Sequence, residues 1–123
     1  MVSETAFGKK IQLMASSLGH RIFRCNRGIG WVGKSIRFSE TMKIEVQAGD
    51  VLIKKARPLH AGLVDGNGDY IGYSSTGKFM SLEIKTETGI ISPDQITWCD
   101  AVNKAGGIAG IVRDEETAFE LLS

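Results

Sequence analysis

Cysteine is scarce in this sequence, and neither of its two cysteines belongs to a recognisable motif. Cys25 and Cys99 lie far apart and form no CxxC or Cys/His cluster. This spacing argues against a zinc site and fits buried or idle thiols in a reducing cytoplasm. The sequence alone does not decide whether the two cysteines form a disulfide.

Long apolar runs are also missing. No stretch approaches the roughly 18 uninterrupted apolar residues needed to cross a bilayer. The N-terminal stretch carries an early acid, Glu4, and has no apolar segment of the kind that a secretory signal requires. The apolar content of 42% and charged content of 24% are ordinary for a globular domain. We therefore expect a cytoplasmic protein with no membrane partner, folded as a single domain over residues 1–123.

The net charge of +1 conceals an uneven distribution. Residues 1–60 carry eleven lysines and arginines against four acids, and the remainder carries four against ten. A basic segment suits a polyphosphate partner, because neutralising phosphates releases counterions, and an acidic segment suits a cation site. On charge alone, however, two solvated surfaces of one mixed fold are the better interpretation.

Periodicity and capping residues predict the secondary structure. Ser3 caps a helix whose apolar residues recur at helical spacing until Gly19. Strands are expected over residues 21–27, 42–47, 51–55, 69–73, 79–86 and 108–112, with a hairpin turn at 48–50 and a glycine-rich bend at 62–68. Ser92, Pro93 and Gln95 form a capping box for a helix that ends near residue 106. Asp114 caps the last helix.

These elements predict an α/β fold with one mixed sheet. The strand, helix and strand over residues 79–112 favour a parallel crossover. The expected order is an N-terminal helix, mostly antiparallel strands that include a β arm over about residues 34–58, and a C-terminal βαβα segment.

Residues 28–35, GIGWVGKS, match the P-loop pattern GxxxxGK[ST] and also GxGxxG. Both motifs bind phosphate only where a helix follows the loop, and here β-branched sequence follows Ser35. A glycine-rich turn between strands is therefore favoured over a nucleotide site that uses Lys34 and Ser35.

Two other motifs are weaker still. Residues 65–69 open like a calcium loop, but Tyr70 stands where glycine is needed and Thr76 where a glutamate is needed. His20 and His60 lack motif partners, so each is expected to be a surface or packing residue.

Asp69 and the tripeptide Glu83-Ile84-Lys85 are the strongest candidates for a metal-binding catalytic site. Residues two apart in a strand face the same side, so Glu83 and Lys85 should emerge together, with Asp69 on the preceding strand. Two carboxylates and a backbone carbonyl suit Mg²⁺, and a neighbouring ammonium can hold a water or a phosphate oxygen. Without further context, an exposed ion pair on a strand is the simpler interpretation.

That context is a series of short motifs along the chain. They are Glu4, GHR at 19–21, RCNRG at 24–28, Trp31, RP at 57–58, GL at 62–63, GNGDYIG at 66–72, LEIKT at 82–86, SPDQ at 92–95, AGG at 105–107 and VR at 112–113. Their order and spacing resemble the VRR-NUC family, a virus-type replication-repair branch of the PD-(D/E)xK nucleases. The resemblance covers nearly the whole chain and is weakest over residues 34–55.

The resemblance implies a restriction-endonuclease-like core and a role for each matching residue. Asp69, Glu83 and the carbonyl of Ile84 would hold Mg²⁺ or Mn²⁺, Lys85 would assist the attacking water, and Gln95 and Glu4 would lie near the metal. Arg24, Arg27, Lys34 and Arg113 would contact DNA phosphates. Gly68 departs from the family name, which has proline before the aspartate, and Asp65 is a rival acid. The capping and catalytic roles of Gln95 are expected to compete.

Small stand-alone members of this family resemble Holliday-junction resolvases, which are homodimers, and some are encoded by phages. The resemblance thus implies a dimeric endonuclease that cuts branched DNA. Two alternatives remain at this point. One is a nucleic-acid-binding module with a nuclease-like fold that no longer cuts, and the other is the small P-loop protein.

Overall fold

The structure is a computed structural model that describes residues 3–26, 28–35, 39–41, 43 and 45–123. It divides into two units. The main unit comprises residues 1–26 and 63–123, and the arm comprises residues 27–62. The arm therefore begins earlier and ends later than the sequence predicted.

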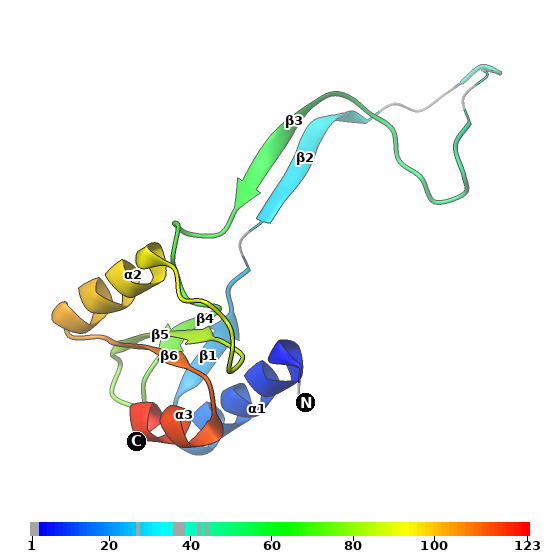
Figure 1. Cartoon of the computed structure of the whole chain (residues 1–123). Helices are drawn as coiled ribbons and strands as arrows, with labels where there is room; N and C mark the ends of the chain where they lie inside the picture. Colours follow the sequence, from blue (N-terminus) through cyan, green and yellow to red (C-terminus); the bar gives the residue numbers. More distant parts are fainter. Residues whose placement is uncertain (1–2, 27, 36–38, 42, 44) are drawn as a thin grey trace. The chain divides into compact units, whose positions relative to one another are not determined.

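The main unit is a mixed α+β fold with a four-stranded sheet (Figure 1). Its helices are α1 (Glu4–Ser17), α2 (Pro93–Lys104) and α3 (Glu115–Leu122), and its strands are β1 (Arg21–Arg24), β4 (Tyr70–Tyr73), β5 (Phe79–Ile84) and β6 (Ile108–Val112). The strand order is β1-β4-β5-β6. The β5–β6 pair is parallel, as predicted from the helix between these strands, and the other pairs are antiparallel.

The central strand β5 separates an apolar layer from a polar one. Met80, Leu82 and Ile84 are fully buried in the core that α1 and α3 cover on one side of the sheet (Figure 1). The alternate residues Ser81 and Glu83 point to the other side, because side chains along a strand alternate between its faces. The polar side chains of Ser81 and Glu83 therefore lie on the face of the sheet that α2 covers.

Local capping explains why the three helices begin where the sequence predicted. The Ser3 hydroxyl accepts a hydrogen bond from the Ala6 amide, and Asp114 accepts one from the Thr117 amide. The capping box of Ser92 and Gln95 is complete. Such caps satisfy amide groups that have no partner within the helix. None of the helices in the described part of the chain is long and apolar enough to span a bilayer.

His20 is a packing residue, one of the two roles that the sequence suggested. Its ring is 7% exposed. Nδ1 accepts a hydrogen bond from the Ser75 amide at 2.9 Å, and Nε2 lies 2.6 Å from the Leu122 carbonyl oxygen. Since Nδ1 accepts, Nε2 carries the proton and donates it to Leu122. His20 thereby ties the β4–β5 turn and the C-terminal helix to the end of α1.

The arm contains a separate two-stranded sheet, so the prediction of one continuous sheet was wrong. Strand β2 (Gly28–Ser35) pairs antiparallel with β3 (Ile53–Ala61). The predicted hairpin paired residues 42–47 with 51–55. Positions 42 and 44 lie outside the described residues, and the described positions from 45 to 52 form no strand. The turn itself is present, with Gly49 at φ +95°.

Candidate active site

Three of the predicted site residues meet at one end of the β4–β5 pair. Tyr70 lies opposite Leu82, so Asp69, just before β4, lies beside the end of β5. Asp69 Oδ2 accepts a hydrogen bond of 2.9 Å from the backbone N–H of Ile84. Glu83 and Lys85 flank Ile84 and share the opposite face of the strand from it. The expected grouping of Asp69, Glu83 and Lys85 is therefore present.

Glu83 is held on two sides. Its side chain is buried at 6% exposure. Its Oε1 accepts a hydrogen bond of 2.5 Å from Gln95 Nε2 and lies 3.5 Å from Lys85 Nζ. Gln95 also caps its helix, because its Oε1 accepts a hydrogen bond from the Ser92 amide. The two ends of one amide thus make the helix cap and the contact with Glu83 at the same time, so the cap does not prevent Gln95 from reaching Glu83.

The surroundings of Glu83 disfavour its negative charge. Burial, followed by the neighbouring carboxylate of Asp69, raises the pKa of Glu83 from 4.5 to about 7, and Glu4 adds to this effect. The Lys85 ammonium opposes the rise but does not cancel it. A buried carboxylate in this setting is one that an additional cation would stabilise.

The oxygen atoms here fit a small hard cation. Asp69 uses Oδ2 and Glu83 uses Oε1 in the contacts above, which leaves Asp69 Oδ1 and Glu83 Oε2 for a ligand. The N–H and C=O of one strand residue point to the same neighbouring strand, so the Ile84 carbonyl faces the side on which Asp69 lies. Two carboxylates and a carbonyl suit Mg²⁺ or Mn²⁺. Among the described residues, no group of three or more His, Cys, Asp or Glu side chains is arranged to hold a metal ion.

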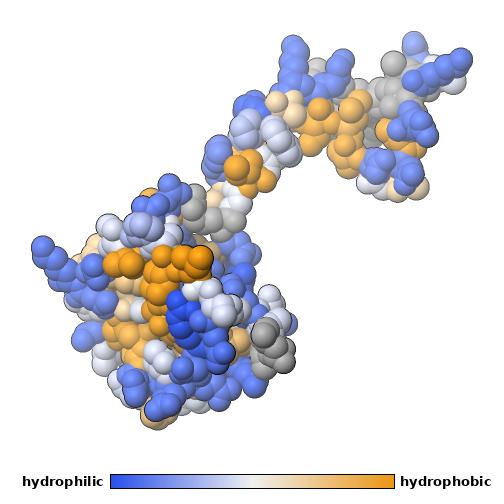
Figure 2. Space-filling model, in the orientation of Figure 1, coloured by the Kyte–Doolittle hydropathy of each residue, from blue (hydrophilic) through white to orange (hydrophobic). Residues whose placement is uncertain are grey.

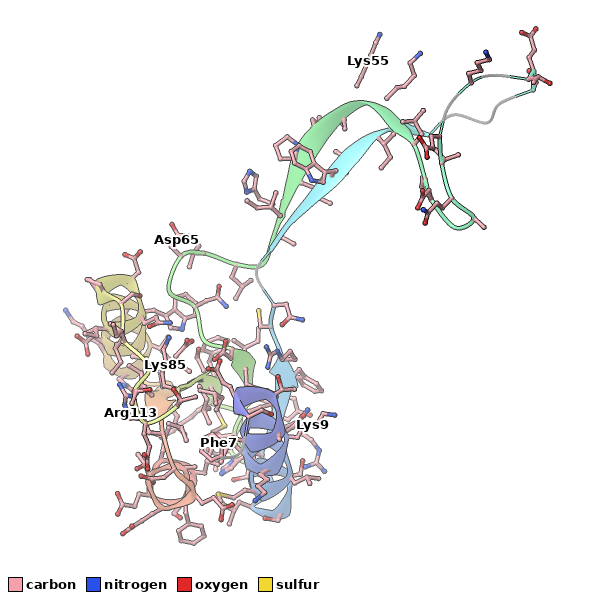
Figure 3. The ribbon with its side chains drawn as sticks, turned by 45° about the vertical axis from the view of Figure 1, so that its right-hand side comes forward. Phe7, Lys9, Lys55, Asp65, Lys85 and Arg113 are labelled. Atoms are coloured by element: carbon pink, nitrogen blue, oxygen red, sulfur yellow. The ribbon has the colours of Figure 1, made fainter. Side chains whose placement is uncertain are left out.

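A cavity of about 500 Å³ opens beside Lys85. Figure 3 labels Lys85 together with Phe7 and Arg113, which also line it. Its lining includes Glu4 and Arg113, so it brings together three residues that the sequence singled out. Phe7, on the same helix as Glu4, supplies an aromatic wall. Arg113 donates hydrogen bonds to the carbonyl oxygens of Thr86 at 2.6 Å and Glu87 at 3.2 Å. Arg113 therefore also fixes the loop that follows β5.

Of the remaining expected DNA contacts, Arg24 is the one whose side chain the structure describes, and it does not line this cavity. Arg24 is exposed, donates a hydrogen bond of 2.8 Å to Asn26 Oδ1, and lies 5.7 Å from the centre of the Tyr70 ring. Arg27 lies outside the described residues, as does the side chain of Lys34. Of the two candidate acids, Asp65 is exposed in the bend before β4, whereas Asp69 reaches β5.

Ser81 and Trp98 support the site although the sequence analysis did not single them out. The Ser81 hydroxyl accepts hydrogen bonds from Trp98 Nε1 at 2.7 Å and from the Gly68 amide at 3.2 Å. It thereby ties α2 and the bend before Asp69 to β5. The alternation of Ser81, Glu83 and Lys85 along an otherwise apolar strand could have revealed a polar row. No comparable pattern marks Trp98.

The structure accounts for glycine at position 68, where the family name has proline. A Cβ atom on Gly68 would lie 2.4 Å from Ser81 Oγ and 2.8 Å from the Leu82 carbonyl oxygen. Proline would also lack the N–H that Gly68 donates to Ser81. Close packing of this bend on β5 therefore requires glycine.

The P-loop interpretation does not fit the geometry. Residues 28–35 form strand β2, not a loop or the turn that the sequence favoured, and no helix follows among the described residues up to β3. A Cβ on Gly33 would lie 2.8 Å from both Ala56 Cα and the Lys54 carbonyl oxygen. The ladder is irregular at this point, and Lys55 has a φ of +51°. A β-bulge explains this glycine.

Comparisons with known protein families, with curated protein sequences and with solved structures found no match. The arrangement of the side chains is therefore the basis for inferring function.

Proposed function

We propose that the chain is a divalent-metal-dependent nuclease with a PD-(D/E)xK core, related to the VRR-NUC family. One observation carries the proposal: Asp69, Glu83 and Lys85 come together at the adjoining ends of strands β4 and β5, and Gln95 donates a hydrogen bond to Glu83. The mixed sheet, with α1 on one face and α2 on the other, is compatible with such a core (Figure 1).

Each side chain has a defined task in this proposal. Asp69, Glu83 and the Ile84 carbonyl would hold Mg²⁺ or Mn²⁺, which when bound supplies an acidified water and charge to stabilise the pentacovalent phosphate. Lys85, 3.5 Å from Glu83, is placed to donate hydrogen bonds to the attacking water or to a phosphate oxygen. Gln95 fixes the orientation of the Glu83 carboxylate and, through its cap, couples that carboxylate to α2.

The substrate class we propose is branched DNA, cut by a homodimer in the manner of a junction resolvase. Residues 27–62 carry seven lysines and arginines against three acids, which supports a polyanionic partner. A two-fold dimer would match the symmetry of a four-way junction.

Exchange of Asp69 for asparagine tests the site. Asparagine keeps an oxygen that can accept the Ile84 N–H but removes a charged ligand. We expect Asp69→Asn to lower metal-dependent cleavage of a labelled DNA duplex by about a thousandfold, equivalent to roughly 4 kcal/mol. The matched control is Asp65→Asn, four residues earlier in the same bend, which should cut normally. Equal activity of both variants would remove Asp69 from the site.

A further inference from the structure

The two faces of the β2–β3 ribbon differ in character. Residues directly opposite in an antiparallel pair share a face. Ile29 lies opposite His60, and Trp31 lies opposite Pro58, so these four side chains form one face, the aromatic face. On the other face Val32 lies opposite Arg57, and Gly30 lies opposite Leu59. The ribbon thus carries one apolar, aromatic side and one side with a basic residue.

No described residue of the arm forms a layer that covers the aromatic face. Trp31 and Ile29 are each 65% exposed, and Pro58 and His60 are exposed as well. Figure 2 shows apolar atoms along the arm interspersed with hydrophilic ones. A two-stranded ribbon is marginally stable alone in water, so a partner that covers this face would stabilise it.

Charge indicates the chemistry of that partner. The arm has seven lysines and arginines and three acids over residues 27–62. Two such arms would repel each other, whereas a nucleic acid would neutralise them. Basic side chains interleaved with exposed aromatic rings are the usual platform for unpaired bases, since every base has a face that can stack.

We propose that the aromatic face of the arm binds unpaired bases of a nucleic acid, with Trp31 as the main stacking ring and His60 beside it. Lys55, at the bulge of β3, then contacts the phosphates, and Lys54 and Arg57, on the opposite face of the ribbon, add to the positive charge of the arm. The bulge at Gly33 alters the direction of the side chains around Lys55, which extends away from the ribbon in Figure 3. This inference rests on the proposed function in one respect: branched DNA that carries single-stranded segments, such as a flap, exposes unpaired bases.

The test is binding of a fluorescent oligo-thymidine strand and of a matched duplex, measured by anisotropy in EDTA so that no cleavage occurs. Trp31→Ala should weaken binding of the single strand roughly ten- to a hundredfold, and that of the duplex much less. Trp31→Phe, which keeps a stacking ring, should retain most of the affinity. Leu59→Ala is the matched control, because Leu59 is an exposed apolar residue on the opposite face.

Three results would overturn this inference. Unchanged single-strand binding by Trp31→Ala excludes stacking on this ring. An equal loss for single strand and duplex indicates binding in a groove instead of to unpaired bases. A change of oligomeric state in Trp31→Ala with unaltered DNA binding identifies a second copy of the chain as the partner. Because the binding assay needs no catalysis, it can still test the stacking proposal if the nuclease proposal fails. Likewise, a failure of the stacking proposal would leave the cleavage assays able to test the nuclease proposal.

Discussion

Replacing Glu83 by glutamine should stabilise the metal-free protein above about pH 7 while abolishing cleavage of DNA. The pKa of Glu83 is raised from 4.5 to about 7, first by burial and then by the charge of Asp69. A carboxyl group with a raised pKa favours the folded state fully below its unfolded value, and this contribution is lost as the pH rises through the folded value. Glutamine is neutral throughout and avoids that loss.

The expected gain is about 1–3 kcal/mol in the free energy of unfolding above about pH 7, and close to zero below pH 4.5. Urea unfolding of both proteins in EDTA, across this pH range, measures it. Glu120→Gln, on the exposed surface of α3, is the control and should show no such dependence. A Glu83→Gln variant that is less stable than wild type at every pH would show that the ionised Glu83 carboxylate does not destabilise the folded protein. The gain in stability with loss of activity is the trade-off expected of a functional site.

Replacing Gly68 by proline, the residue that the name PD-(D/E)xK places before the aspartate, should strongly destabilise this chain. A Cβ there would lie 2.4 Å from Ser81 Oγ and 2.8 Å from a backbone oxygen of Leu82. The backbone oxygen cannot move aside as a flexible side chain could, and proline also removes the N–H donated to Ser81. We expect Gly68→Pro to lose roughly 3–5 kcal/mol, and Gly68→Ala somewhat less.

Thermal or urea unfolding measures this effect. Gly28→Ala is the control, because a Cβ at position 28 meets nothing within 4 Å. A Gly68→Pro variant with the stability of the control would mean that the bend does not pack on β5 as described. The hydrogen bond from Ile84 to Asp69 would then need another explanation, since this packing places Asp69.

Much of the main unit could be predicted because its determinants are local. Ser3, Ser92 and Asp114 each cap a helix within three residues of their partners, and the segment from β5 to β6 follows one short crossover. The grouping of Asp69 with Glu83 also follows from two strands joined by a tight turn. These features need no knowledge of distant contacts.

The sequence predicted a β arm, but which of its segments pair could not be predicted in the same way. Its pairing joins Gly28 to Ala61, more than thirty positions away, and β propensity alone does not select a partner strand. The sequence pattern around Gly33 resembled a phosphate loop, yet the glycine serves close backbone packing at a bulge. Likewise, the sequence suggested that the cap and the contact of Gln95 with the site would compete, whereas its amide oxygen accepts the bond from Ser92 and its amide nitrogen donates the bond to Glu83.

Cleavage of a labelled four-way junction and of a matched linear duplex, with Mg²⁺ or Mn²⁺, tests the nuclease proposal most directly. Wild type should make paired, metal-dependent nicks in the junction, and Lys85→Ala should make none. Lys104→Ala, in the last turn of α2, should cut as wild type does. Equal cutting of both substrates would retain the nuclease and remove the preference for junctions. Tight binding without cleavage by the wild type with either metal would contradict the proposal and identify the chain as a nucleic-acid-binding module.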